Sequence, residues 1–297
     1  MDRQIAQISM GDHVDLYGTG EVMGDLIRNG KSVKLWNTDN YAYGKDNGQR
    51  LYQSHPWVLG VRNDGSSFGV IADNTWKMEI SLGERITFSS EGPAFRVIVI
   101  EKETPQDVMK ELGKLTGTIS LPPLWSLGFH QCRYSYYPDT RVKSLADSMR
   151  IKNIPCDVIW MDIDYMQDFR IFTFDSTGFS NPNETNDYLH KNNFKSVWMI
   201  DPGIKAEEGY FVYDSGEKID AWIKNSNDSV FIGKVWPGDC VFPDFTQSKV
   251  SNWWGGLYKN FMSTGIDGVW NDMNAVSYTH LRAHETLRYL VCRLLLE

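Results

Sequence analysis

The first third of the chain is built from short apolar runs with the spacing of β-strands. Residues 76–81 alternate apolar and polar side chains, which is the period of a strand buried on one face. The apolar runs 57–62 and 68–72 flank a turn that contains Asp64 and Gly65, so they indicate a hairpin. Residues 95–100 are rich in β-branched side chains. Several short strands with turn signals between them predict an antiparallel β-sandwich.

A helix is predicted next, at about residue 105. Thr104 has the side chain of an N-cap, and Pro105 suits the first helical position. The apolar residues at 108, 112 and 115 then fall on one face of the helix, and Gly117 is suited to end it. The Leu-Pro-Pro-Leu segment at 121–124 has the composition of a linker into a second domain.

From residue 125 onward, apolar strands alternate with helices. We predict strands at 127–132, 157–162, 197–200 and 268–270, and helices that begin at Asp139, near residue 184 and at residue 248. Asp139 is expected to be an N-cap. The helix over 248–263 is expected to bury Val250, Trp253, Leu257 and Phe261. Residues 202–246 show little periodicity and are interpreted as an insertion.

Each predicted parallel strand ends in polar residues. These are Arg133, Asp162 with Asp164, Asp201, and Asp272. The carboxyl ends of strands hold the active site both in a (β/α)₈ barrel and in an open doubly wound sheet. The sequence lacks a G-x-G-x-x-G segment after the first strand, which argues against a dinucleotide-binding fold. Four strands make half a barrel with open edges, so we expect the chain to be truncated.

The two acidic residues allow two interpretations each. Asp272 is either a catalytic carboxylate in a pocket walled by Trp270 and Met273, or the cap of the following turn. Asp162 is either part of the same site or a buried structural acid. Spacing alone does not decide between these alternatives.

Composition narrows the class of protein. A net charge of −8 argues against a nucleic-acid or anionic-membrane surface, and no apolar run is long enough to span a membrane. The four cysteines form no C-x-x-C pair, so we expect no metal site and no cofactor. Their scattered positions favour the cytoplasm. Aromatic residues make up 13%, including 11 tryptophans, which suits either large cores or walls that stack on sugar rings.

Eight motifs together identify a resemblance. They are Tyr17-Gly-Thr-Gly-Glu21, Leu35-Trp-Asn-Thr-Asp39, Gly128-Phe-His-Gln-Cys-Arg133, Asp162-Ile-Asp-Tyr-Met166, Ile200-Asp-Pro-Gly-Ile204, Lys234-Val-Trp-Pro-Gly238, Phe242-Pro-Asp-Phe-Thr246 and Trp270-Asn-Asp-Met-Asn274. In this order and at these spacings they resemble glycoside hydrolase family 31, the α-glucosidase group. The resemblance implies a galactose mutarotase-like β-sandwich followed by the first half of a (β/α)₈ TIM barrel.

The resemblance also implies a retaining mechanism, in which two carboxyl groups act across the scissile bond. By position, Asp272 matches the nucleophile and Asp162 matches an acid that hydrogen-bonds hydroxyls of the nonreducing sugar. The remaining matched contacts of the sugar pocket are Asp39, Tyr134, Ile163, Ile204, Trp236, Trp270 and Met273. The implied substrate is a terminal nonreducing α-linked glucose of an oligosaccharide.

The match ends near Asn274. The family continues with Glu-Pro, whereas this chain continues with Ala275 and a tail that we interpret as a non-native scar, with a genuine helix over 287–295 as the alternative. We therefore predict a sandwich domain with its linker over 1–120, lacking its start, barrel strands one to four over 121–274, and the tail over 275–297. The family's acid/base Asp lies beyond the nucleophile, so the chain as written is expected to be poorly folded and inactive.

Two other functions stay open at this point. One is a non-catalytic sugar-binding protein that kept the pocket walls and lost the acid. The other is a family member with α-xylosidase or transglucosidase specificity. Asp162, Ile163 and Trp236 favour glucose, because a sugar 6-hydroxyl needs room and a partner. Linkage preference and oligomeric state are not indicated by the sequence.

Overall fold

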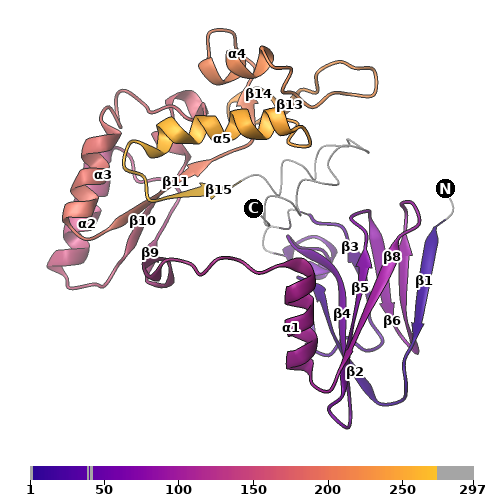
Figure 1. Ribbon diagram of the computed structural model, residues 1–297. Helices are drawn as coiled ribbons and strands as arrows, with labels where there is room; N and C mark the ends of the chain where they lie inside the picture. Colours follow the sequence, from indigo (N-terminus) through magenta and orange to yellow (C-terminus); the bar gives the residue numbers. More distant parts are fainter. Residues whose placement is uncertain (1–2, 39, 41–42, 273–297) are drawn as a thin grey trace. The chain divides into compact units, whose positions relative to one another are not determined.

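The computed structural model describes residues 3–38, 40 and 43–272. The chain divides between Ile119 and Ser120 into two compact units, each described by itself (Figure 1). Three predicted features lie outside the described residues. They are Asp39, Met273 and the segment 275–297 with its alternative helix.

The first unit consists of two four-stranded antiparallel sheets. One sheet has the order β1-β7-β6-β3 and the other has the order β2-β4-β5-β8. The strands are β1 (Gln4–Ser9), β2 (Val14–Gly20), β3 (Ser32–Leu35), β4 (Ser54–Arg62), β5 (Ser67–Asp73), β6 (Met78–Leu82), β7 (Arg85–Ser90) and β8 (Arg96–Lys102). Leu16 and Val58 of one sheet share a fully buried core with Ile80 and Phe88 of the other. The predicted antiparallel sandwich is confirmed, including the β4–β5 hairpin.

Helix α1 (Pro105–Thr116) follows β8 and packs against β5 and β8. Its start is as predicted, because the Thr104 hydroxyl accepts a hydrogen bond from the Asp107 N–H at 3.2 Å and Pro105 takes the first turn. Gly117 ends the helix with a φ of 83°, a conformation that glycine adopts without strain. Val108 is buried, whereas Leu115 remains exposed, so the predicted apolar face is covered only in part.

The second unit is built on a four-stranded parallel sheet of order β15-β11-β10-β9. Its strands are β9 (His130–Gln131), β10 (Val158–Met161), β11 (Lys195–Ile200) and β15 (Gly268–Asn271). In chain order they are the four predicted strands, each paired with the next. The parallel β/α segment of a barrel is therefore confirmed.

Helices α2 (Asp139–Ile151), α3 (Pro182–Lys191) and α5 (Ser248–Met262) alternate with these strands and share one core with β10 and β11. Two details of the prediction are wrong. Pro138, not Asp139, is the N-cap of α2, and the Asp139 carboxylate instead accepts from Lys143 one turn on. On α5, Trp254 is buried, whereas Trp253 and Leu257 are only partly buried against the same core.

The predicted insertion has structure of its own. It contains β12 (Ile204–Lys205), α4 (Phe211–Glu217), β13 (Gly233–Val235) and β14 (Gly238–Val241), and the strands form a small antiparallel sheet of order β12-β14-β13. A separate small core of Ile223, Cys240 and Phe242 lies under it. Strands of two to four residues are too short for their side-chain period to be visible in the sequence.

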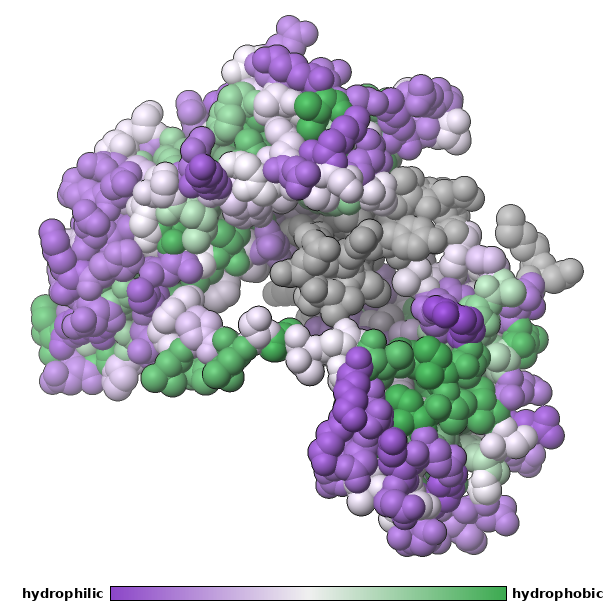
Figure 2. All heavy atoms as spheres, in the orientation of Figure 1, coloured by the Kyte–Doolittle hydropathy of each residue, from purple (hydrophilic) through white to green (hydrophobic). Residues whose placement is uncertain are grey.

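The segment between the units exposes apolar side chains along its length (Figure 2). Ile119, Leu121 and Leu124 are each more than four-fifths exposed. Across the described ranges, no helix is both long and apolar enough to cross a membrane.

Candidate active site

Carboxyl groups lie at the carboxyl ends of three strands of the parallel sheet. Asp162 directly follows β10, and Asp272 directly follows β15. Between these strands lies β11, which Asp201 follows. Cys132 directly follows β9, and the negative charges of both Asp162 and Asp272 raise the pKa of its thiol, after the larger effect of burial. The ends of β9, β10 and β15 therefore place Cys132, Asp162 and Asp272 near enough to one another for their charges to interact.

Asp272 is held by its backbone at the end of β15. Its main-chain N–H donates to the carbonyl of Ile200 at 3.2 Å, which continues the pairing with β11. The preceding Asn271 accepts a hydrogen bond from the Tyr258 hydroxyl of α5 at 2.9 Å. Burial raises the pKa of the Asp272 carboxyl, and the charge of Asp162 raises it further. Asp272 thus takes up a proton at a higher pH than an exposed Asp does.

Asp162 begins a short helical turn over Ile163–Tyr165. Its Oδ1 accepts a hydrogen bond from the Ile163 N–H at 2.7 Å. Burial raises the pKa of the Asp162 carboxyl, this hydrogen bond lowers it, and the charge of Asp164 raises it; the net shift is upward. One carboxylate oxygen is bound by the backbone, which leaves the other for a hydroxyl donor.

Aromatic rings lie next to these carboxyl groups along the strands. The rings of Trp160 and Trp270 meet edge to face, with their centroids 5.4 Å apart. Both residues are half-buried. Because residues two apart on a strand face the same side, Trp160 lies on the face of Asp162, and Trp270 lies on the face of Asp272. Trp270 is therefore beside Asp272, as a wall of the same site would be.

A second group of rings gathers on the loops. Trp236 occupies the turn between β13 and β14, and its ring lies 6.3 Å from that of Tyr134 and 6.0 Å from that of Phe169. Tyr134 and Trp236 are each at least half exposed. We call Tyr134, Trp236 and Phe169 the aromatic rim. Its exposed faces can stack on a sugar ring.

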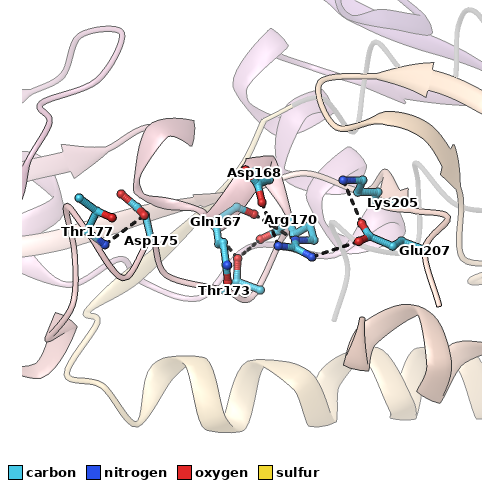
Figure 3. Close-up of polar contacts among 8 residues, drawn as sticks. All are labelled: Gln167, Asp168, Arg170, Thr173, Asp175, Thr177, Lys205 and Glu207. Carbon is cyan, nitrogen blue, oxygen red and sulfur yellow. Dashed lines mark hydrogen bonds and ion pairs between the residues drawn. The ribbon is translucent and has the colours of Figure 1, made fainter. Parts of the chain in front are cut away.

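Ion pairs fix the loop that carries Phe169 (Figure 3). Arg170 binds the Asp168 carboxylate at 3.0 Å and the Glu207 carboxylate at 3.5 Å, and Glu207 also pairs with Lys205 at 2.9 Å. Thr173 accepts a hydrogen bond from the Gln167 N–H at 3.0 Å within the same loop. These contacts connect the loop after β10 to the segment that follows β12. They therefore restrain the loop that carries Phe169 of the aromatic rim.

The two isoleucines that we predicted to contact the sugar are buried more deeply than the aromatic rim. Ile163 and Ile204 are both buried within the main core, with Ile204 paired to Val241 across β12 and β14. Their contact with a sugar stays a prediction, as do the roles assigned to Asp39 and Met273 outside the described residues. In the part of the chain that the structure describes, no group of three His, Cys, Asp or Glu side chains is arranged to hold a metal ion.

Two residues of the site were missed by sequence reasoning. Cys132 was predicted as the end of a strand but not as a neighbour of the carboxyl groups. The signal for it was its place beside Arg133, which was singled out as a polar strand end. Phe169 gave no signal, because its contact with Trp236 joins two irregular loops.

A parallel β/α segment with carboxyl groups at the carboxyl ends of its strands and exposed rings on the loops beside them is the arrangement of a (β/α)-barrel domain. The TIM-barrel domain of glycosyl hydrolases family 31 matches residues 119–289, and the N-terminal galactose mutarotase-like domain of this family matches residues 2–80. The first match covers more than half of the chain, so the chain belongs to glycosyl hydrolase family 31.

Several of the proteins that the chain is similar to are named α-glucosidases. The chain is 40% identical to alpha-glucosidase 2 of Bacillus thermoamyloliquefaciens over 92% of this chain and 35% of that protein. It is 54% identical to the crystal structure of a family 31 α-glucosidase from Bacteroides thetaiotaomicron, with a TM-score of 0.83, over 91% of this chain and 46% of that one. A Flavobacterium johnsoniae dextranase is 26% identical, with a TM-score of 0.81. The chain thus spans about a third to a half of the length of these relatives.

Proposed function

We propose that the protein is a retaining α-glucosidase that removes glucose from the nonreducing ends of α-linked oligosaccharides, with Asp272 as its nucleophile. The observation that carries the proposal is the position of two half-buried carboxyl groups, Asp162 and Asp272, at the carboxyl ends of two strands of one parallel sheet, where the charge of Asp162 raises the pKa of Asp272. This is the edge where barrel enzymes hold their catalytic groups.

The two carboxylates have different tasks in the proposed reaction. An Asp272 oxygen attacks the anomeric carbon of glucose while the bond to the leaving oxygen breaks, and that oxygen takes a proton from an acid. By the resemblance, this acid follows Asp272 in the family sequence. It then activates a water molecule, which splits the glucosyl ester and frees Asp272. Asp162 accepts hydrogen bonds from sugar hydroxyls, and its charge also favours the positive transition state.

Glucosyl oligosaccharides are the substrates to test first. One solved relative, a glucosidase II α subunit, carries alpha3-Glc2, and the Flavobacterium johnsoniae dextranase carries isomaltotriose. The rim of Tyr134 and Trp236 offers exposed rings for such neutral sugars, and Asp162 offers an acceptor for their hydroxyls. Maltose and isomaltose would compare two linkages, and an α-xyloside would test the alternative specificity.

We propose further that the isolated 297-residue chain does not turn over glucosides, because the acid implied by the resemblance is not among its matched residues. The test compares this chain with a chimaera in which its residues 3–272 replace the matching segment of the Bacteroides thetaiotaomicron α-glucosidase. We expect hydrolysis of p-nitrophenyl α-glucoside by the chimaera alone. Turnover by the purified 297-residue chain that Asp272→Asn abolishes would overturn this part of the proposal.

The alternative of a non-catalytic sugar-binding protein makes a different prediction for the same chimaera. It predicts binding of maltose without release of glucose. Transfer of glucose to a second sugar instead of water would favour the transglucosidase alternative, so the products are to be separated by chromatography.

The division into 1–120, 121–274 and a non-native 275–297 also stays a proposal, as does a cytoplasmic location. Sequencing the source nucleic acid across the codon for Asn274 tests the division. Codons for Glu-Pro after Asn274 would support it, and the present codons through Glu297 would contradict it.

A further inference from the structure

A layer of rings lies beneath the polar side chains of the candidate active site. β9, β10 and β15 each carry a ring two residues before a polar residue of the site, and such residues share one face of the strand. We call these rings, His130, Trp160 and Trp270, the ring layer. Its two tryptophans precede Asp162 and Asp272 by two residues along their strands.

The ring layer is continuous although β11 separates two of its members. Neighbouring strands are about 4.8 Å apart, so side chains on β10 and β15 meet only if both are large. The Trp160 and Trp270 rings do meet, at 5.4 Å. Trp160 pairs in register with Val197 of β11, whereas Trp270 pairs with Met199, so the two indoles lie in neighbouring rows and meet diagonally across β11.

The third ring is joined to the layer by a hydrogen bond. The indole N–H of Trp160 donates to Nδ1 of His130 at 3.2 Å, and the two ring centroids are 5.8 Å apart. An indole nitrogen can only donate, so His130 Nδ1 must carry no hydrogen. The ring hydrogen of His130 is then on Nε2. This tautomer follows from the hydrogen bond.

Nε2 of His130 is buried and has no hydrogen-bond partner among the described residues. A buried donor without a partner is unfavourable, and a plain apolar side chain would avoid this. The imidazole is nevertheless oriented so that its Nδ1 accepts the hydrogen bond from the Trp160 indole. The hydrogen bond to Trp160 is thus the polar contact that this histidine makes within the described ranges.

We propose that His130 is a positioning residue for Asp272. Nδ1 of His130 holds the Trp160 indole, the Trp160 ring holds Trp270, and Trp270 orients the end of β15 that carries Asp272. The proposal deepens the proposed function, since it concerns how the nucleophile is aimed. Its test is nevertheless independent of turnover, because it reads the tautomer and the hydrogen bond directly.

The test uses nuclear magnetic resonance on the full chain labelled with nitrogen-15 and carbon-13. His130→Asn keeps an acceptor near the position of Nδ1, whereas His130→Gln keeps a donor near the position of Nε2 and loses that acceptor. The two variants remove the same ring and differ in the atom that faces Trp160. Trp160→Phe identifies the Trp160 indole signal, and Asp272→Asn identifies the Asp272 carboxyl signal.

We expect the wild-type His130 ring to show a bare Nδ1 and a protonated Nε2. We expect the Trp160 indole hydrogen to exchange with solvent at least tenfold faster in His130→Gln than in the wild type, and slowly again in His130→Asn. The Asp272 carboxyl titration should move in His130→Gln and be restored in His130→Asn. The proposal would be overturned by a hydrogen on Nδ1 of His130 in the wild type. It would also be overturned if the Trp160 indole hydrogen exchanged equally fast in His130→Gln and His130→Asn, or if neither variant changed the titration of Asp272.

Trp160→Phe keeps the test valid if a His130 variant fails to fold. It leaves the imidazole in place and removes only the donor with its five-membered ring. We then expect Nδ1 to gain hydrogen, as a mixture of tautomers, and an unchanged bare Nδ1 would contradict the proposal. If the proposed function failed instead, glucosyl transfer to Asp272 would be lost while these signals stayed as described.

Discussion

The charge of Asp162 raises the pKa of the Asp272 carboxyl, although the two residues end strands that lie on opposite sides of β11. Burial is the larger cause of the same upward shift. A nucleophile must be ionised, so a raised pKa makes its activity fail earlier as the pH falls. The pH dependence of Asp272 is therefore tied to the charge of Asp162.

Removal of the Asp162 charge should extend activity to lower pH. In the chimaera, Asp162→Asn lowers the pKa of Asp272, so Asp272 stays ionised at a pH where it is protonated in the parent. The acid limb of kcat against pH then moves to lower pH. KM should rise by about 10- to 100-fold, because a hydrogen bond to a charged group is worth about 1.5–3 kcal/mol. An acid limb that stays in place or moves to higher pH would contradict the linkage.

Loss of the rim tryptophan should weaken binding and leave the chemistry intact. Trp236→Ala removes the ring that contacts both Tyr134 and Phe169. Stacking on a ring is worth about 1 kcal/mol, so KM should rise about fivefold with little change in kcat. Phe129→Ala is the matched control, since this half-exposed ring directly precedes β9, at its amino end. Equal KM values for the two variants would remove Trp236 from the substrate site.

Arg170→Met should also raise KM, but indirectly, by loosening the loop that carries Phe169. Arg170 holds Asp168 and Glu207 together, and its own side chain is largely buried (Figure 3). Methionine fills similar space without the charge, so the loop with Phe169 should loosen and KM rise about twofold to fivefold. Lys224→Met, which breaks more exposed ion pairs on another loop, serves as the control. A KM identical in Arg170→Met and the parent would contradict this effect.

Asp267 should stabilise the barrel unit in a pH-dependent way. Burial alone would raise the pKa of its carboxyl, but hydrogen bonds from Lys195, the Ser196 N–H and His190 outweigh it and lower the pKa. A lowered folded-state pKa gives stability above the ordinary pKa of about 3.9, which is lost as pH falls through the folded-state value. Asp267→Asn should therefore reduce the free energy of unfolding by about 2 kcal/mol at pH near 7.

The measurement for Asp267 is urea unfolding of parent and variant across acidic and neutral pH. The difference between them should shrink as the pH falls below about 4. Asp73→Asn is the control, because its pair with Arg96 lies in solvent and such pairs contribute less than about 1 kcal/mol. A constant difference at every pH would show that the charge of Asp267 is not the cause.

Three strands of the sheet that carries the site, β10, β11 and β15, could be predicted because each contains an apolar run that ends at or near an acid. Val158–Met161 is such a run, and Asp162 comes directly after it. The start of α1 was equally visible, since Thr104 and Pro105 act within one helical turn. Signals for strand ends and helix starts of this kind involve only a few neighbouring residues, so they can be recognised in the sequence.

Contacts between distant segments could not be predicted in this way. Asp139 has a capping side chain but bonds Lys143, because Pro138 already occupies the cap position of α2. The contact of Phe169 with Trp236, and the hydrogen bond of Trp160 to His130, depend on how loops and strands meet in space. The motifs of the family pointed to the candidate site, and the packing around it came only from the structure.

The identity of the nucleophile can be tested by trapping the glucosyl ester in the chimaera. An α-glucosyl fluoride needs no acid for its first step, and a second fluorine on the sugar ring slows the release of the ester. Mass spectrometry of the digested protein should find one fluoroglucosyl group on the peptide that contains Asp272, and none in Asp272→Asn. A label on Asp162 or Asp201, or continued hydrolysis by Asp272→Asn at the parent's rate, would contradict the assignment of Asp272.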